Sequence, residues 1–247
     1  MSAAYIDLDG TLVGPSGSLL HDGEGRVTDA AVRALAHLRR AGVPVVLMSG
    51  RGRERLERVA ALIGADGIIA ELGASQCGFP TRAGQTVHQA IAESGVPAAL
   101  LALEPGLEPH PLGVRGREGS HVLRGRASAA APRLVASLSA GSLRLADNGG
   151  GGGGEEPRVY HLLPAGAGKA AAVAADIAAR RIDAVDCLAV GNSLHDLEVG
   201  DVVGEMAIVA NGAAADPLLA ARASWVTAGS YGAGVLEAVE AWLSRAR

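Results

Sequence analysis

The sequence predicts an α/β fold, in which a parallel-sheet core with flanking helices is interrupted by an inserted α+β domain. Short apolar segments alternate with helical patterns over the first 75 residues and again from about residue 163 onward. Strands that alternate with helices indicate a parallel sheet with right-handed crossovers. Between these two parts the alternation loosens. We therefore expect a Rossmann-like core of residues 1–75 and 163–247 and an inserted cap of residues 76–162.

Three strands are expected in the first part of the core, at residues 3–8, 43–48 and 67–70. The first helix begins near Thr28, a residue type that accepts hydrogen bonds from the N–H groups of a helix start, and it ends before Gly42. The second helix ends before Gly64. Apolar side chains repeat at helical spacing in both: Val32, Leu35 and Leu38 in the first, and Leu56, Val59, Ala60 and Ile63 in the second.

The rest of the chain divides into the insertion and the second part of the core. In the insertion we expect helices near 87–94 and 128–139, strands at 113–124, 142–146 and 159–163, and a hairpin tip at glycines 149–154. The core then resumes with a helix at 169–181, strands at 187–190, 206–210 and 224–226, a helix near 214–221, and a final helix with Val235, Val239, Trp242 and Leu243 on one side.

Composition excludes several classes of protein. The formal net charge is −4 and aromatic residues make up 2% of the 247 residues, so we expect no nucleic-acid partner and no anionic membrane surface. No apolar run approaches the length of a membrane span, and no signal segment precedes the first strand. Cys77 and Cys187 are interpreted as small buried hydrophobic residues in a reducing compartment. We expect a cytoplasmic protein, either a monomer or a homodimer.

Two aspartates end the first expected strand. Asp7 and Asp9 are two residues apart, and residues two apart on a strand point to the same face. Like charges on one face are costly unless a cation or a proton separates them. Gly10, followed by Thr11, lets the chain turn and lets backbone N–H groups approach an anion. The motif predicts a hard divalent cation and a phosphate together, although by itself it could also be a strand that ends in a turn.

Further polar residues follow two other expected strands and open a helix. Ser49 and Gly50 follow the second strand, Lys169 opens the helix at 169–181, and the segment 191–196 follows the strand at 187–190. An open α/β sheet binds its ligand at the carboxyl ends of the strands, so we expect these residues to meet. A hydroxyl group and a backbone N–H suit phosphate oxygens, and a lysine supplies compact positive charge.

The motifs resemble those of the haloacid dehalogenase (HAD) superfamily of phosphatases, which use an aspartate as nucleophile. Within that superfamily the chain is similar to the branch with a large cap between the second and third motifs. That branch includes phosphoglycolate phosphatases, mannosyl-3-phosphoglycerate phosphatases and sucrose-phosphatase-like enzymes. The segments 115–120, Arg-Gly-Arg-Glu-Gly-Ser, and 230–232, Ser-Tyr-Gly, support this placement.

The resemblance implies a division of labour between the two aspartates. Asp7 is the nucleophile, whose carboxylate forms an acyl-phosphate, and Asp9 is the general acid and base for the leaving oxygen and for water. Phosphate contacts are expected from six residues: Gly10, Thr11, Ser49, Gly50, Lys169 and Asn211.

The resemblance also implies bound Mg²⁺. Its ligands are the Asp7 carboxylate, the backbone carbonyl of Asp9, and the first side chain of the 191–196 loop, which is Asn192 here. The superfamily has an aspartate at that position, and an amide oxygen is a neutral and weaker donor, so we expect a weakened metal site. Asp196 is expected to act through water or to move in and restore the missing charge. His195 is interpreted as a simple loop histidine.

Several charged residues are candidates for recognising the rest of the substrate. Arg115, Arg117 and Glu118, with Arg51 from the core, are expected to grip a second anionic group such as a carboxylate, which suits arginine. On a strand at 113–124, Arg115 and Arg117 would share one face. The alternative is a solvated, charged face of the cap.

The sequence thus predicts an Mg²⁺-dependent phosphomonoester hydrolase that acts through an aspartyl-phosphate on a small phosphorylated acid or sugar. Two alternatives stay open. One is a phosphosugar mutase of the same fold. The other is a phospho-ligand binder whose metal site Asn192 has disabled, although a binder would not need the nucleophile.

Overall fold

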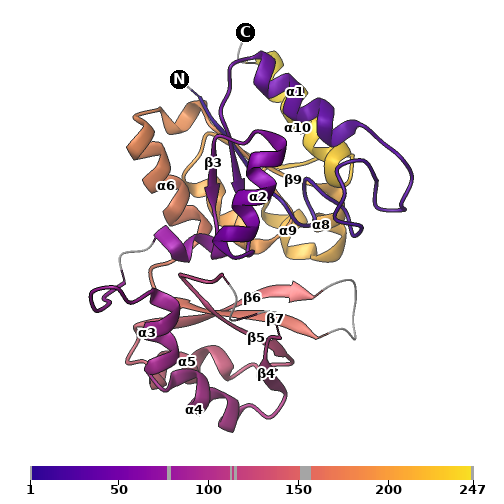
Figure 1. The fold of residues 1–247 in the computed structure, drawn as a ribbon. Helices are drawn as coiled ribbons and strands as arrows, with labels where there is room; N and C mark the ends of the chain where they lie inside the picture. The colour runs from indigo at the N-terminus through magenta and orange to yellow at the C-terminus, as the bar shows by residue number, and fades with distance from the viewer. Residues whose placement is uncertain (1, 77–78, 112, 114–115, 151–156, 246–247) are drawn as a thin grey trace. The chain divides into compact units, whose positions relative to one another are not determined.

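The computed structural model describes residues 2–76, 79–111, 113, 116–150 and 157–245. The chain forms two compact units (Figure 1). The first consists of the residues up to Ser49, Glu57–Ile69 and the residues from Gly168 onward, and the second consists of Gly50–Leu56 and Ala70–Ala167.

The first unit contains a six-stranded sheet of order β10-β9-β8-β1-β2-β3, in which every pair of neighbours is parallel. The strands are β1 (Ala4–Asp7), β2 (Val45–Met48), β3 (Gly67–Ile69), β8 (Leu188–Gly191), β9 (Glu205–Ile208) and β10 (Trp225–Val226). The strand order reverses between β1 and β8, and parallel α/β sheets bind ligands outside the carboxyl ends of the strands at such a point. We therefore expect the ligand site among the residues that follow β1 and β8.

Helices flank this sheet. They are α1 (Ala30–Arg40), α2 (Arg53–Ile63), α6 (Lys169–Arg180), α7 (Leu194–Leu197), α8 (Ala210–Ala215), α9 (Pro217–Arg222) and α10 (Tyr231–Arg245), and α1 packs along α10. Alternate residues of the strands, such as Tyr5, Met48 and Ala189, form one buried cluster with Val173 of α6. Cys187 belongs to this cluster as a buried free thiol, as predicted, whereas Cys77 lies outside the described residues.

The second unit is an antiparallel sheet of order β4-β5-β7-β6 with helices on one side (Figure 1). Its elements are β4 (Leu107–Pro109), β5 (His121–Gly125), β6 (Leu143–Gly150), β7 (Arg158–Pro164), α3 (Val87–Glu93), α4 (Val96–Leu103) and α5 (Ala131–Leu138). Ile91, Leu100 and Val135 of the helices pack on Leu123 and Leu162 of the sheet. This is the α+β cap that the sequence predicts, with an additional helix and strand, α4 and β4.

The units divide at other residues than the sequence suggested. The second unit extends from Ala70 to Ala167 rather than over 76–162, and it includes Gly50–Leu56. Packing explains the last segment, because a Cβ atom on Gly52 would lie 2.7 Å from the carbonyl oxygen of Gly116. Such a close approach requires glycine.

Two predicted elements were wrong in detail. Residues 116–120 form turns and bends rather than part of a strand, because Gly116 has a φ of +66° and β5 begins only at His121. The helix expected near 214–221 is two short helices, because Asp216 is extended and Pro217 starts α9. Of the glycines expected at a hairpin tip, 151–154 lie outside the described residues.

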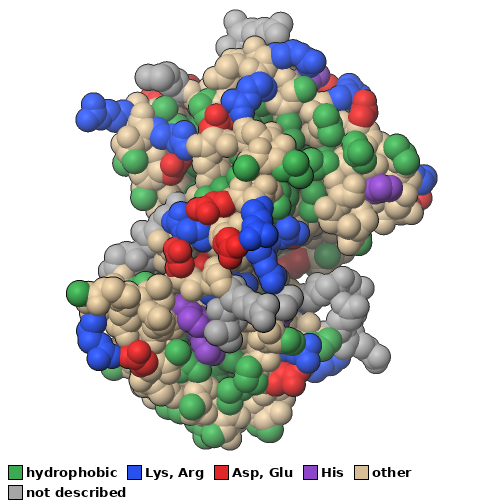
Figure 2. All heavy atoms as spheres, viewed as in Figure 1, with side chains coloured by type: hydrophobic (Ala, Val, Ile, Leu, Met, Phe, Trp, Pro, Cys, Tyr) green, Lys and Arg blue, Asp and Glu red, His purple; other side chains and the backbone are tan. Residues whose placement is uncertain are grey.

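On the face shown in Figure 2, Lys and Arg side chains are interspersed with Asp and Glu side chains. Within the described ranges, every helix is too short or too polar to cross a membrane.

Two histidines stack inside the second unit, which makes its stability dependent on pH. The rings of His88 and His121 lie 5.3 Å apart, centre to centre, at an angle of 13°. Burial and the neighbouring His88 lower the pKa of His121 from 6.5 to about 4. As the pH falls from 6.5 toward 4, the unfolded chain binds a proton at His121 that the folded chain does not bind, so stability present above pH 6.5 is lost.

We therefore expect His121→Gln to make thermal stability less dependent on pH. Unfolding midpoints measured from about pH 7.5 to about pH 4.5 should fall more steeply for the unmutated protein than for the variant. The matched control is His37→Gln, which changes a partly exposed histidine of α1. Equal slopes for the unmutated protein and His121→Gln would contradict the assignment.

Candidate active site

The site lies at the carboxyl end of β1, the strand between β2 and β8. Asp7 is the last residue of β1 and is 4% exposed. The chain then turns back on itself, with the Leu12 N–H donating to the Asp7 carbonyl and the Val13 N–H donating to the Leu8 carbonyl. Gly10 has a φ of +84°, and a Cβ atom there would lie 2.4 Å from Nδ2 of Asn192. The predicted glycine turn is present, and it also makes room for Asn192.

Lys169 joins two buried carboxylates. It is the first residue of α6, and its Nζ lies 2.6 Å from Oδ1 of Asp7 and 2.6 Å from Oδ1 of Asp196. A lysine at a helix N-terminus is opposed by the helix dipole, and the two carboxylates supply the compensating charge. The sequence predicted that Lys169 would lie near the nucleophile, and the structure places it in direct contact with Asp7.

The three charges shift one another's pKa values. Burial disfavours the ammonium of Lys169, but Asp196 and Asp7 raise its pKa above the ordinary value. Burial likewise disfavours the charged form of Asp196, but Lys169 holds its pKa below the ordinary value. For Asp7, burial and the charge of Asp196 outweigh Lys169 and raise the pKa to about 7. Asp7 is therefore the more basic carboxylate of the two, which suits a nucleophile.

Both carboxylate oxygens of Asp196 accept hydrogen bonds from other residues, Oδ1 from Lys169 and Oδ2 from the turn at 192–193. Its Oδ2 accepts hydrogen bonds from the backbone N–H of Asn192 (3.1 Å), the backbone N–H of Ser193 (3.0 Å) and the hydroxyl of Ser193 (2.6 Å). Asp196 thus braces both Lys169 and the turn that carries Asn192. Ser193, which starts α7, was not among the predicted site residues, although the pattern Ser-x-x-Asp at a helix start could have indicated it.

Two side-chain oxygens converge on the hydroxyl of Thr11. This buried hydroxyl lies 3.0 Å from Oδ2 of Asp7 and 3.1 Å from Oδ1 of Asn192, and it can donate to only one of them at a time. Among the residues that the structure describes, no group of three or more His, Cys, Asp or Glu side chains could hold a metal ion. A carboxylate and an amide oxygen nevertheless fit Mg²⁺, which binds one or two carboxylates and keeps several water molecules.

Asp9 is exposed, in contrast to Asp7, because β1 ends before it. The hydroxyl of Ser49, the residue after β2, donates to Oδ2 of Asp9 at 3.2 Å. A carboxyl group at the surface of the site can exchange protons with water and with a leaving group, as a general acid and base must.

Asn211 holds the turn at Gly10 in place. Its side-chain amide donates to the Gly10 carbonyl at 2.8 Å, and its side-chain oxygen accepts from the backbone N–H of Tyr231 at 2.8 Å. The amide nitrogen carries a second N–H, so the predicted phosphate contact would not require Asn211 to break either bond. Tyr231, at the start of α10, was not predicted to take part.

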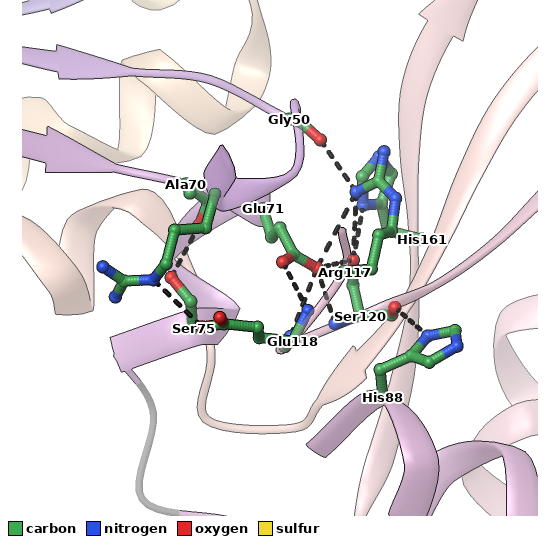
Figure 3. Close-up of polar contacts among 11 residues, drawn as sticks. Gly50, Ala70, Glu71, Ser75, His88, Arg117, Glu118, Ser120 and His161 are labelled. Atoms are coloured by element: carbon green, nitrogen blue, oxygen red, sulfur yellow. Dashed lines mark hydrogen bonds and ion pairs between the residues drawn. The ribbon is translucent and has the colours of Figure 1, made fainter. Parts of the chain in front are cut away.

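The second unit contains the predicted recognition residues, apart from Arg115, which lies outside the described residues. The Arg117 side chain is 12% exposed, and its Nη1 donates to the Gly50 carbonyl at 3.0 Å (Figure 3). Its Nε is buried without a hydrogen-bond partner in the part of the chain that the structure describes. Glu118 forms an ion pair of 3.0 Å with Arg53, and Arg51 is half-buried beside Gly50 in the chain.

Comparison with known proteins supports this interpretation of the motifs. No family model matches the chain. It is 29% identical over 248 residues to a phosphoglycolate phosphatase of Methanothermobacter thermautotrophicus, with 98% of this chain and 99% of that protein covered. A phosphoglycolate phosphatase of Haloarcula marismortui is 39% identical over 80 residues, which is 32% of this chain and 34% of that protein.

Solved structures share the fold at lower identity. The sucrose-phosphatase of Synechocystis sp. PCC6803 has a TM-score of 0.67 and 17% identity, with 97% of each chain covered. The HAD-superfamily phosphatase BT1666 of Bacteroides thetaiotaomicron also has a TM-score of 0.67 and 17% identity, with 98% of this chain and 95% of that one covered. The chain is thus similar over nearly its whole length to a phosphoglycolate phosphatase, and it shares the fold of phosphatases of the haloacid dehalogenase superfamily.

Proposed function

We propose that the protein hydrolyses phosphomonoesters through an aspartyl-phosphate on Asp7. The observation that carries this proposal is the contact of 2.6 Å between Lys169 and Asp7 at the end of a central strand, next to the exposed Asp9. Lys169 orients the Asp7 carboxylate and offsets the charge of an incoming phosphate, whose repulsion would otherwise oppose attack.

The chemistry balances with these two aspartates. A carboxylate oxygen of Asp7 forms a bond to phosphorus while the ester P–O bond breaks, and Asp9 gives its proton to the leaving oxygen. Asp9 then takes a proton from water, and the water oxygen attacks phosphorus. This second step releases inorganic phosphate and regenerates the Asp7 carboxylate.

We also propose that Asp7 and Asn192 hold Mg²⁺, with the Asp9 carbonyl as the third ligand that the superfamily resemblance implies. The support is the convergence of their side-chain oxygens on Thr11. When bound, Mg²⁺ offsets negative charge on the phosphoryl oxygens.

For the substrate we propose a small phosphomonoester with a second anionic group, such as 2-phosphoglycolate. One support is the similarity over 98% of the chain to a protein named phosphoglycolate phosphatase. Another is the guanidinium of Arg117, whose side chain is 12% exposed and whose Nη1 donates to the carbonyl of Gly50 within the second unit. A planar guanidinium suits a substrate carboxylate.

The test of the nucleophile is Asp7→Asn. Because an amide does not attack phosphorus, the variant should lose turnover of p-nitrophenyl phosphate by roughly 10³-fold or more. The matched control is Asp176→Asn, which changes a carboxylate of the same unit that binds Tyr5 and Arg180. This control should retain activity. Retention of most of the activity by Asp7→Asn would refute the assignment.

The test of substrate recognition is Arg117→Ala. Loss of a charge-assisted hydrogen bond should raise the KM for 2-phosphoglycolate by about 10- to 100-fold and change that for p-nitrophenyl phosphate little. The control is Arg124→Ala, which removes an exposed arginine paired with Glu108 in the same unit. An equal rise in KM for both substrates would count against a recognition role.

The test of the metal site is Asn192→Asp. The variant should bind Mg²⁺ at least several-fold more tightly, because a carboxylate adds one negative charge to the donor set. Calorimetric titration of Mg²⁺ into both proteins measures this without reference to activity. Unchanged affinity would mean that Asn192 does not contact the metal.

A further inference from the structure

A carboxylate outside the catalytic site organises the segment that carries Arg117. Glu71, which follows β3, is 0% exposed and belongs to the second unit (Figure 3). Its Oε1 accepts the backbone N–H of Glu118 at 2.8 Å. Its Oε2 accepts the N–H of Gly119 at 3.2 Å, the N–H of Ser120 at 2.9 Å and the hydroxyl of Ser120 at 2.6 Å. Three successive N–H groups that converge on one anion form a nest.

These bonds replace the strand pairing that residues 117–120 do not have. β5 begins at His121, so the N–H groups before it need other acceptors, and Glu71 provides them. A Cβ atom on Gly119 would lie 2.4 Å from the backbone nitrogen of Ser75, which shows how closely the segment packs on the chain after Glu71.

The opposite side of the same segment is held by histidines. The His88 N–H donates to the Glu118 carbonyl at 2.8 Å, and its Nδ1 lies 2.7 Å from the Ser120 carbonyl, to which it donates. Nδ1 of His161 lies 3.3 Å from the Ser120 hydroxyl. With Glu71 on one side and His88 on the other, the backbone of 118–120 has a single defined path.

Glu71 is also the counterion of Arg117. Nη1 of Arg117 lies 3.8 Å from Oε2 of Glu71, and both side chains are largely or fully buried. A guanidinium in such a place is stable only beside a compensating charge. The Glu71 carboxylate therefore fixes Arg117 in two ways. Its charge pairs with the guanidinium, and its hydrogen bonds hold the backbone of residues 118–120, which follow Arg117.

The backbone at Glu71 is strained in order to present this carboxylate. Glu71 and Leu72 have φ values of +53° and +56°, in the left-handed region that non-glycine residues seldom adopt. Such strain persists only where the surroundings enforce it, and it concentrates at functional positions. Neither Glu71 nor this conformation was predicted from the sequence.

We propose that Glu71 is a positioning residue, which holds Arg117 in the orientation that binds the second anionic group of the substrate. The inference rests on the proposed function, since it concerns the same recognition step. It adds a residue that need not touch the substrate and that acts through Arg117.

The experiment is a set of single and double variants. Glu71→Gln keeps the shape of the side chain but removes its charge and turns an N–H donor toward the nest. We expect the KM for 2-phosphoglycolate to rise roughly tenfold or more, and kcat/KM for p-nitrophenyl phosphate to stay within about twofold. If Glu71 acts through Arg117, the double variant Glu71→Gln/Arg117→Ala should have the same KM as Arg117→Ala alone.

The matched control is Glu104→Gln. Glu104 is another buried carboxylate of the second unit, and it accepts hydrogen bonds from the N–H and hydroxyl of Ser128. It should lower the unfolding temperature without changing either KM. Ser120→Ala removes one of the four donors to Glu71 and should change the KM for 2-phosphoglycolate in the same direction but less, which provides a test if Glu71→Gln fails to fold.

Amide hydrogen exchange of residues 118–120 gives a readout that needs no substrate, and it should become faster in Glu71→Gln but not in Glu104→Gln. Unchanged exchange, an equal effect on both substrates, or additive effects of Glu71→Gln and Arg117→Ala would overturn the positioning role. If the unmutated protein hydrolyses p-nitrophenyl phosphate but not 2-phosphoglycolate, the proposed substrate fails instead, and the exchange measurement decides the contacts of Glu71 separately.

Discussion

The ammonium of Lys169 between Asp7 and Asp196 is the interaction on which the rest of the site depends. Two carboxylates cannot be buried side by side without a compensating charge, and Lys169 supplies it at 2.6 Å to each. Two carboxylates and one ammonium leave one negative charge, and the three further donors to Asp196 stabilise its carboxylate more than that of Asp7. The same arrangement therefore stabilises the strand ends and leaves Asp7 as the more basic carboxylate, as its proposed role as nucleophile requires.

Around this ion pair, the residues that hold the backbone differ from those that we propose to react or to bind the metal ion. Asp196 and Asn211 use their side chains on backbone groups of the 191–193 turn and of the Gly10 turn. Asp7, Asp9 and Asn192 project from the segments so held. A reacting group must be fixed to within a fraction of an ångström, and rigid neighbours with satisfied hydrogen bonds achieve this at low cost in entropy.

The second unit repeats this principle with other residues. There Glu71 is the buried acceptor, the backbone of 118–120 is the braced segment, and Arg117 is the side chain presented. In both units a buried carboxylate collects successive backbone N–H groups and contacts a buried cation. The two cations, Lys169 and Arg117, are thereby held beside carboxylates that lie far from them in the chain. No local sequence pattern would have paired these residues.

The sequence by itself determined the parallel core, the α+β character of the insertion and the glycine turn after Asp7, because alternation, capping and turn chemistry are local properties. It also predicted that Lys169 and the 191–196 segment would meet Asp7, since parallel strands bring their carboxyl ends to one edge. Only the tertiary structure decided that Asp196 braces Lys169, that Asn211 holds Gly10, and that Glu71 captures residues 118–120 in place of strand pairing. These contacts join residues far apart in the chain, so packing fixes them and no local pattern encodes them.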